Sequence, residues 1–258
     1  MPSNPAIEAA KPAATCTMAA IAAEPAAETL ATGAPLNNWR GRNGAVGRRW
    51  PSEAALRAIS ALIPPAARGA ATALDAGCGS GRHALALHEL GFGRVIATDA
   101  DPQMAALTCA AAKRCGAEVT VHAAPLNRQP LPDAAADVAL SWGTLFQLGG
   151  RAATTAALRE LRRVTRPGGA VIADWRTDDD SLRDFASEVM EPSTVRLGAG
   201  APAGLAGMIY SFWSADDVSA LCAASGLTIV WLERCEIRDV RNDRRFAWWV
   251  TGARPSTS

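Results

Sequence analysis

The sequence lacks several features that mark common protein classes. Its net charge is only +1, it has a single tyrosine, and it has only three histidines. It also lacks any apolar run of the roughly 18–20 residues that a membrane-spanning helix needs. The balanced charge removes a general electrostatic argument for nucleic acid or an anionic membrane as a partner. We therefore do not expect an integral membrane protein, and nucleic acid would need a local basic patch to bind.

Cysteine pairs of the Cys-x-x-Cys type are also missing, although the chain has six cysteines. A structural zinc site is therefore not expected, and we predict no metal. The first residues contain no compact apolar segment behind a basic start, so they do not resemble a signal peptide. These features predict a cytoplasmic protein with reduced thiols, and we expect a monomer or a homodimer.

The composition divides the chain into three parts. Residues 1–36 are rich in Ala and Pro and predict a disordered tail. Residues 37–66 predict an N-terminal cap or lid, with a basic segment at 39–50 and a helix at 53–62. Residues 67–254 form the main predicted domain, within which 176–213 is expected to be an inserted lid.

Short apolar strands alternate with helix-period segments in the main domain. Five strands are predicted at 72–76, 94–98, 118–122, 137–141 and 170–175, with helices at 82–90, 102–114, 152–164 and 215–225. Two further strands, at 227–233 and 245–251, have no helix between them and predict an antiparallel pair. The pattern predicts an α/β fold: a Rossmann-like, seven-stranded, mostly parallel sheet with an antiparallel C-terminal strand and helices on both faces.

The most specific pattern is a glycine-rich turn between a predicted strand and a predicted helix. Glycine occupies positions 77, 79 and 81, and Arg82 follows directly. Glycines let the backbone turn tightly and approach a ligand, and a helix start offers free N–H groups. Arg82 stands where a dinucleotide-binding loop carries its third glycine, and no Gly-Lys-Ser/Thr follows. The pattern therefore disfavours NAD, FAD and P-loop nucleotides.

Two aspartates follow the next predicted strand. Asp99 lies 22 positions after Gly77, and a carboxylate there can accept hydrogen bonds from both hydroxyls of a ribose. Asp101 precedes Pro102, which is typical of a helix N-cap with proline at the first helical position. We expect Asp99 to bind a nucleoside ligand and Asp101 to cap a helix.

Four ordered motifs resemble those of the class I S-adenosylmethionine-dependent methyltransferases, over about residues 70–176. They are the strand and glycine loop at 73–82, Asp99, the segment 129–138, and the segment 160–169. The resemblance implies a small-molecule methyltransferase with S-adenosyl-L-methionine as cofactor.

The resemblance also implies the cofactor-binding residues. The family often uses an aspartate for the adenine where this chain has Pro125, so adenine recognition would rest on the Leu126 backbone N–H and on apolar packing. The residues implied at the cofactor are Asp75, Gly77, Cys78, Gly79, Gly81, Asp99, Ala100, Leu126 and Ser141.

Acceptor-side residues are predicted at the carboxyl ends of strands, where ligands of open α/β sheets bind. Trp142 and Trp175 end two predicted strands and are interpreted either as walls of an acceptor pocket or as core residues. Asp174 flanks Trp175 and is a further candidate, but no residue is predicted as a general base. The predicted substrate residues are Trp39, Trp142, Trp175, Arg176 and Tyr210.

Three charged residues receive structural interpretations instead. Asp137 is expected to anchor the start of a strand, and Glu160 and Arg163 to lie on a solvated helix face. The favoured function is methyl transfer to a small, aromatic or heteroaromatic metabolite. An RNA-modifying methyltransferase using the arginines of 40–49 is one alternative, and a non-catalytic cofactor-binding regulatory module is another.

Overall fold

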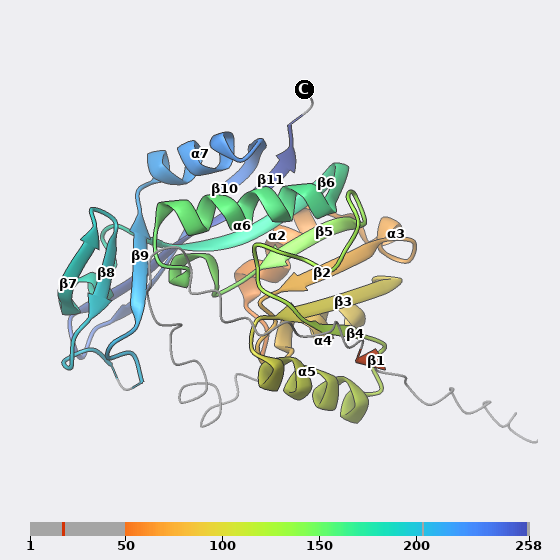
Figure 1. Ribbon diagram of the computed structural model, residues 1–258, viewed down its shortest axis with the longest axis horizontal. Coiled ribbons are helices and arrows are strands. Elements are labelled where there is room, and N and C mark those ends of the chain that lie inside the picture. The colour runs from red at the N-terminus through yellow and green to blue at the C-terminus, as the bar shows by residue number, and fades with distance from the viewer. Residues whose placement is uncertain (1–16, 19–49, 203, 257–258) are drawn as a thin grey trace, which may run out of the picture.

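A central sheet with helices on both faces makes up the computed structural model, which describes residues 17–18, 50–202 and 204–256 (Figure 1). The helices are α2 (Glu53–Leu62), α3 (Pro65–Arg68), α4 (Arg82–Glu89), α5 (Pro102–Cys115), α6 (Arg151–Val164) and α7 (Ala215–Ala224), with short 3-10 helices η1 (Leu145–Gln147) and η2 (Ser181–Phe185). The strands are β1 (Thr17–Met18), β2 (Thr72–Ala76), β3 (Arg94–Asp99), β4 (Thr120–Ala123), β5 (Ala136–Ser141), β6 (Thr165–Thr177), β7 (Ala186–Glu191), β8 (Thr194–Leu197), β9 (Ile209–Trp213), β10 (Leu227–Asp239) and β11 (Arg244–Pro255).

The strand order confirms the predicted α/β fold. Parallel strands run in the order β4-β3-β2-β5-β6, and β11 pairs antiparallel with β6 and with β10. These seven strands are those that the sequence predicts. The described part of the chain has four more, β1, β7, β8 and β9, so the sheet has eleven strands. None of the described helices is long and apolar enough to cross a membrane.

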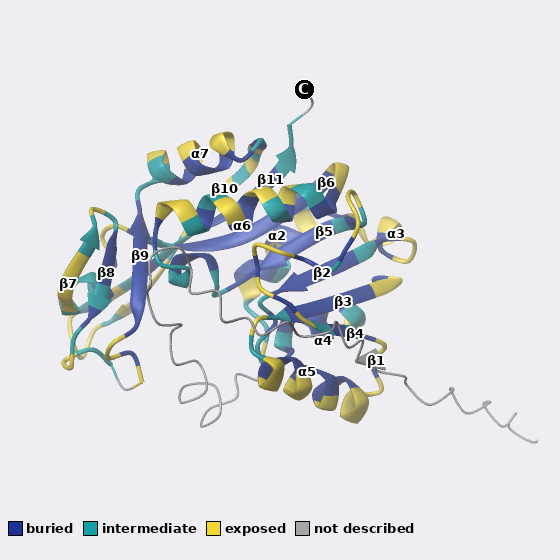
Figure 2. Ribbon diagram, in the orientation of Figure 1, coloured by how far each residue is buried: buried dark blue, intermediate teal, exposed yellow. Residues whose placement is uncertain are grey.

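Two buried clusters lie on opposite faces of the sheet. Ala58 of α2, Leu87 of α4 and Ala112 of α5 belong to one cluster, and Leu158 of α6 and Leu221 of α7 belong to the other. Figure 2 shows exposed residues along the outer sides of α5, α6 and α7, with the central strands buried. A mostly parallel sheet needs this cover on both faces, because its strands are apolar on both sides.

The expected tail contains one pairing that the sequence does not predict. Thr17 and Met18 form β1, which pairs in parallel with Thr120 and Val121 of β4. Two residues are too few to show the alternation that marks a strand in a sequence. The strand forms through its hydrogen bonds with β4, which is distant in the chain. The other residues of the predicted tail lie outside the described residues, as do residues 37–49 of the predicted cap, whereas its predicted helix at 53–62 is present as α2. Cys109 of α5 is disulfide-bonded, so the expectation of reduced thiols is wrong at this position.

The expected lid at 176–213 contains regular structure. It includes η2 and the antiparallel strands β7, β8 and β9, and we call this part of the chain the edge extension. It joins the main sheet where Arg176 and Thr177 at the end of β6 pair with Phe212 and Trp213 of β9. A third buried cluster, which includes Phe146 and Tyr210, packs inside it. The long connector is therefore a folded extension of the sheet at the carboxyl end of β6.

Two charged residues at the opposite end of the sheet, Asp137 and Arg163, receive structural roles from the sequence. The expectation for Asp137 is confirmed and that for Arg163 is wrong. Asp137 accepts a hydrogen bond from the backbone N–H of Thr72 at 2.7 Å, which confirms its anchoring role. Arg163, by contrast, is not merely solvated. It donates to Glu160, to Asp133 and to the backbone carbonyl of Leu131, because α6 faces the loop that leads into β5. The arginine ties this loop to the helix.

Candidate functional site

The glycine-rich turn connects β2 to α4 at the carboxyl edge of the sheet. Gly77, Gly79 and Gly81 have φ angles of +83°, +56° and +90°, in the left-handed region that favours glycine. A Cβ on Gly77 would overlap the Thr144 hydroxyl, whereas a Cβ on Gly79 would meet no atom within 4 Å. Gly77 is therefore required by packing inside the protein, and Gly79 borders open space in which a ligand can lie.

The turn is joined to the end of β3 by hydrogen bonds. The backbone N–H groups of Gly77 and Cys78 both donate to the Thr98 carbonyl at 2.8 Å. Oδ2 of Asp99 accepts from the Gly79 N–H at 2.9 Å, and its Oδ1 accepts from the Asp101 N–H at 2.9 Å. Each carboxylate oxygen keeps lone pairs for a further donor. Burial raises the pKa of Asp99, and the two backbone donors oppose this rise.

Asp101 has the separate role that the sequence predicts. It is the N-cap of α5, and its side chain accepts a hydrogen bond from the Gln103 N–H. Ala100, between the two aspartates, is exposed. Cys78 is buried with its Sγ 3.4 Å from the Thr108 hydroxyl, and burial raises the pKa of the thiol well above its ordinary value. The Cys78 side chain therefore packs as a neutral thiol, and its contribution to a ligand would come from its backbone.

The loop after β4 approaches the same edge of the sheet. Ala124 donates its N–H to the Asp99 carbonyl at 2.8 Å, which places Leu126 close to Asp99 along this loop. Leu126 is buried, and no described residue accepts a hydrogen bond from its backbone N–H. Buried Gln129 holds the loop, since it accepts from the Thr98 hydroxyl and donates to the Pro125 carbonyl, both at 2.8 Å. No sequence pattern selects Gln129, because its role depends on these tertiary contacts.

Two buried carboxylates lie at the ends of β2 and β6. Both oxygens of Asp75 are buried, and burial raises its pKa to about 7, against the opposing effects of Arg82 and the Ala84 backbone N–H. Asp174 accepts the Gly143 N–H at Oδ1 over 2.6 Å, and burial raises its pKa to about 6. The positive charge of Arg82 opposes both increases, so this guanidinium lies close to both carboxylates. The described residues therefore form an acidic region beside the glycine turn.

The end of β5 supplies an aromatic wall. Trp142 is buried, and its ring centroid lies 6.0 Å from that of His83. His83 accepts a hydrogen bond from the Ser52 N–H at 3.1 Å, and Arg82 donates to the Trp50 carbonyl. The last residues of the segment that the sequence predicts as a lid therefore contact the start of α4. Ser141 is fully buried, and its hydroxyl has no hydrogen-bond partner.

The remaining predicted substrate residues lie in different parts of the fold, and two of them are core residues. Trp175 is fully buried in the cluster under α6 and α7, and its indole N–H donates to Thr251 at 3.0 Å. Tyr210 is fully buried in the edge extension, with its ring 5.1 Å from that of Phe146. These positions favour the packing interpretation for both side chains. Arg176 lies at the carboxyl edge, and Trp39 lies outside the described residues.

Comparison with known proteins supports this description. Residues 73–169 match the family model of the methyltransferase domain. A tRNA U34 carboxymethyltransferase of Shewanella sp. (strain W3-18-1) is 28% identical over 171 residues, which are 66% of this chain and 44% of the relative. Another, from Shewanella denitrificans, is 27% identical over 193 residues, 74% of this chain and 51% of the relative. The chain spans about half the length of these curated relatives.

Solved structures share the fold at lower identity. A SAM-dependent methyltransferase of Methanosarcina mazei aligns with a TM-score of 0.63 at 18% identity, over 74% of this chain and 94% of the other. The 1,6-didemethyltoxoflavin-N1-methyltransferase of Burkholderia thailandensis, with its substrate and S-adenosylhomocysteine bound, aligns with a TM-score of 0.60 at 21% identity, over 84% of each chain. Residues 73–169 therefore form a methyltransferase domain, and the chain has the fold of the SAM-dependent methyltransferases that it resembles.

Proposed function

We propose that this protein transfers a methyl group from S-adenosyl-L-methionine to a small, aromatic or heteroaromatic metabolite. The observation that carries the proposal is the link between Asp99 and Gly79, with open space beside the glycine. This arrangement offers a nucleoside a carboxylate for its ribose and a bare backbone for its amino-acid part. A cytoplasmic location remains part of the proposal, because the curated relatives are named as enzymes of tRNA.

The residues present fit the cofactor. Asp99 would accept the ribose hydroxyls, and the Leu126 N–H, which has no acceptor among the described residues, would meet the adenine. The turn from Gly77 to Gly81 would lie along the methionine part. The buried Asp75 carboxylate lies near the end of β2, directly before that turn, where the positive groups of the ligand would offset its negative charge.

The cofactor supplies an electrophilic methyl group on a sulfonium sulfur. The protein's task is then to hold an acceptor atom in line with that methyl group and to exclude water, so proximity and orientation carry much of the rate. Trp142 offers a flat apolar wall at the end of β5, which suits a flat ring. The edge extension joins the sheet at the end of β6, the strand next to β5, and this favours an acceptor small enough to fit between folded elements.

An RNA acceptor is the second candidate, because the curated relatives are tRNA carboxymethyltransferases. Arg238 and Arg241, near the turn between β10 and β11, are largely exposed and offer positive charge to a phosphate backbone. Asp239 and Asp243 lie beside these arginines and neutralise much of that charge. We therefore place the small-molecule acceptor first.

One experiment separates these functions. The purified protein is incubated with S-adenosyl-L-methionine carrying a tritiated methyl group, together with either a small-metabolite extract or total tRNA. Label in a small molecule supports the proposal, and label in tRNA that falls steeply with added salt supports the alternative. Calorimetric binding of the cofactor with no transfer to either fraction would identify a regulatory module instead.

A further inference from the structure

Asp174 and Arg176 lie two residues apart near the end of β6, so their side chains share one face of the sheet. Ile172, two residues earlier on the same strand, packs in one buried cluster with Trp142. The aspartate and the arginine therefore lie on the face of Trp142, at the carboxyl edge where ligands of such sheets bind.

The Asp174 side chain is held in place by one hydrogen bond, and one of its carboxylate oxygens has no hydrogen-bond donor in the described part of the chain. Oδ1 accepts the Gly143 N–H at 2.6 Å, and no other described residue donates a hydrogen bond to Oδ2. The residue is only 7% exposed, so water gives the carboxylate little competition. The charges of Arg176 and Arg82 both favour the ionised form. Oδ2 is therefore a fixed hydrogen-bond acceptor beside the aromatic wall.

Arg176 is fixed from the other side. Its Nη1 donates to Oδ2 of Asp180 at 2.8 Å, and its guanidinium lies over the Phe146 ring at 5.4 Å. The fully enclosed Asp180 also accepts the N–H groups of Leu182 and Ala247, both at 2.8 Å. Nε and Nη2 of Arg176 have no acceptor among the described residues. Two donors of a preorganised guanidinium are therefore available.

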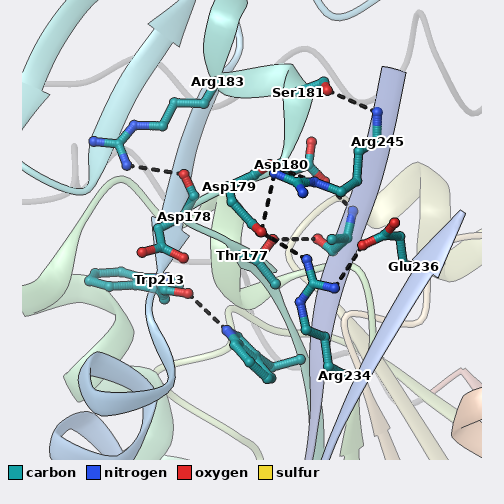
Figure 3. Close-up of polar contacts among 12 residues, drawn as sticks. Thr177, Asp178, Asp179, Asp180, Ser181, Arg183, Trp213, Arg234, Glu236 and Arg245 are labelled. Atoms are coloured by element: carbon teal, nitrogen blue, oxygen red, sulfur yellow. Dashed lines mark hydrogen bonds and ion pairs between the residues drawn. The ribbon is translucent and has the colours of Figure 1, made fainter. Parts of the chain in front are cut away.

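The turn that carries Asp180 is itself tied down. Figure 3 shows Asp179 between Arg234 of β10 and Arg245 of β11, and both arginines pair with its carboxylate, at 2.9 and 3.2 Å. Ser181 accepts the backbone N–H of Arg245 at 2.9 Å. These contacts hold the turn against β10 and β11. Because Asp180 lies in this turn, its ion pair keeps the Arg176 guanidinium in one orientation.

A tryptophan lies next to the arginine. Trp248 is the cross-strand partner of Arg176, and its indole N–H is buried without a hydrogen-bond partner. This nitrogen is enclosed by protein atoms, so Trp248 contributes packing beside the guanidinium and no direct contact with a ligand. A free carboxylate or phosphate fits less well, because Arg176 already pairs with Asp180 and the Asp174 carboxylate lies on the same face of the sheet. The region therefore suits a neutral ligand that carries both a hydrogen-bond acceptor, for Arg176, and a hydrogen-bond donor, for Asp174.

We propose that Asp174 and Arg176 recognise the methyl acceptor together, and that the acceptor is a ring carrying a carbonyl oxygen next to an N–H or O–H group. This rests on the proposed function and names the substrate class of its site. Arg176 donates to the carbonyl oxygen, and Oδ2 of Asp174 accepts the neighbouring proton. The lone pair on the deprotonated ring atom forms the bond to the methyl carbon, and the electrons of the breaking carbon–sulfur bond stay on sulfur. The proton ends on Asp174.

The variants that test this keep the fold contacts. Asp174→Asn retains an oxygen for the Gly143 N–H but replaces the free acceptor with an amide donor. Arg176→Lys keeps the charge and a partner for Asp180 but loses the planar pair of donors. Asp178→Asn, on the same turn but exposed, is the matched control.

The measurements are the dissociation constant of S-adenosyl-L-methionine by calorimetry, and the methylated product formed in a metabolite extract, identified by mass spectrometry. We expect all three variants to bind the cofactor within threefold of the parent protein. We expect Asp174→Asn to lose at least about 100-fold in methyl transfer, the usual effect of removing a proton acceptor, and Arg176→Lys about tenfold.

The product should carry the new methyl group on a ring nitrogen or oxygen next to a carbonyl. A product without that carbonyl, or an Asp174→Asn protein with parental turnover, overturns the inference while the proposed function stands. A tenfold loss of cofactor affinity in Asp174→Asn also overturns it, because the aspartate then belongs to the cofactor site. A parent protein that binds cofactor but labels no small molecule contradicts the proposed function itself, and the inference with it.

Discussion

The backbone N–H of Gly79 donates a hydrogen bond to the carboxylate of Asp99 over 2.9 Å. This bond joins the turn after β2 to the turn after β3, so the two parts of the nucleoside site hold each other in place. Removing either partner changes both turns. The site is therefore best probed with variants that separate the loss of a ligand contact from the loss of this internal bond.

The Asp99→Ala substitution tests the ribose contact. It removes a carboxylate that would accept two hydrogen bonds, each worth about 1.5–3 kcal/mol when the acceptor is charged. We expect the affinity for S-adenosyl-L-methionine to fall by roughly 100-fold or more, measured by calorimetry. Asp101→Ala is the control, because it removes the N-cap of α5, at about 1 kcal/mol of stability, and leaves the Asp99 carboxylate in place. Parental affinity in Asp99→Ala would refute the assignment.

Two glycine substitutions separate packing from ligand contact. Gly77→Ala places a Cβ against Thr144, whereas Gly79→Ala places one in open space. We expect Gly77→Ala to lower the free energy of unfolding by about 2 kcal/mol or more, through overpacking and backbone strain. Gly79→Ala has the same backbone strain without that overlap, so it should lose less stability, about 1 kcal/mol, and lose cofactor affinity at least about tenfold. Equal effects of both variants on stability and on affinity would contradict this division of roles.

The anchoring role of Asp137 predicts an effect on stability, which denaturation measures. Asp137→Ala leaves the Thr72 N–H without its acceptor and removes the partner of Arg166. We expect a loss of about 1–3 kcal/mol in the free energy of unfolding, measured in urea. Asp133→Ala provides the comparison, because that side chain is 81% exposed and its pair with Arg163 contributes little. Cofactor affinity should stay unchanged in both, and a loss of affinity in Asp137→Ala would argue against a purely structural role.

Stability should depend on pH through the buried acids. The folded-state pKa of Asp75 is about 7 and that of Asp174 about 6, both above the ordinary value of 3.8. Between pH 4 and 7 the folded protein therefore binds more protons than the unfolded chain, and the free energy of unfolding falls as pH rises. For Asp75 we expect a fall on the order of 2 kcal/mol between pH 5 and 8. Urea unfolding of Asp75→Asn should show a smaller fall, and identical slopes would contradict the assignment.

The elements that the sequence predicts best have local causes. Strand β2 and the start of α5 lie where they were predicted, because an apolar run and the Asp101–Pro102 pair each fix an element within a few residues. The position of Asp99 was also predictable, since it follows from the end of a strand.

The contacts that the sequence did not reveal are between segments far apart in the chain. Gln129 holds the loop beside Asp99 through Thr98, and the Arg163 contacts form only once α6 lies against the loop before β5. The run at 209–213 is buried at every position, so it lacks the alternation by which a strand is recognised. Trp175 and Tyr210 have aromatic side chains of the kind that often contact ligands. Which face of the sheet such a side chain occupies depends on strand register, which the sequence does not specify.

The edge extension is attached to the main sheet through few backbone pairings, those of Arg176 and Thr177 with β9. A stretch inserted in this way can be lengthened, shortened or exchanged during evolution while the sheet remains intact. The groups proposed to hold the nucleoside come from other strands and would be unaffected. Among proteins built on this plan, preference for the methyl-receiving molecule can therefore drift faster than the choice of donor.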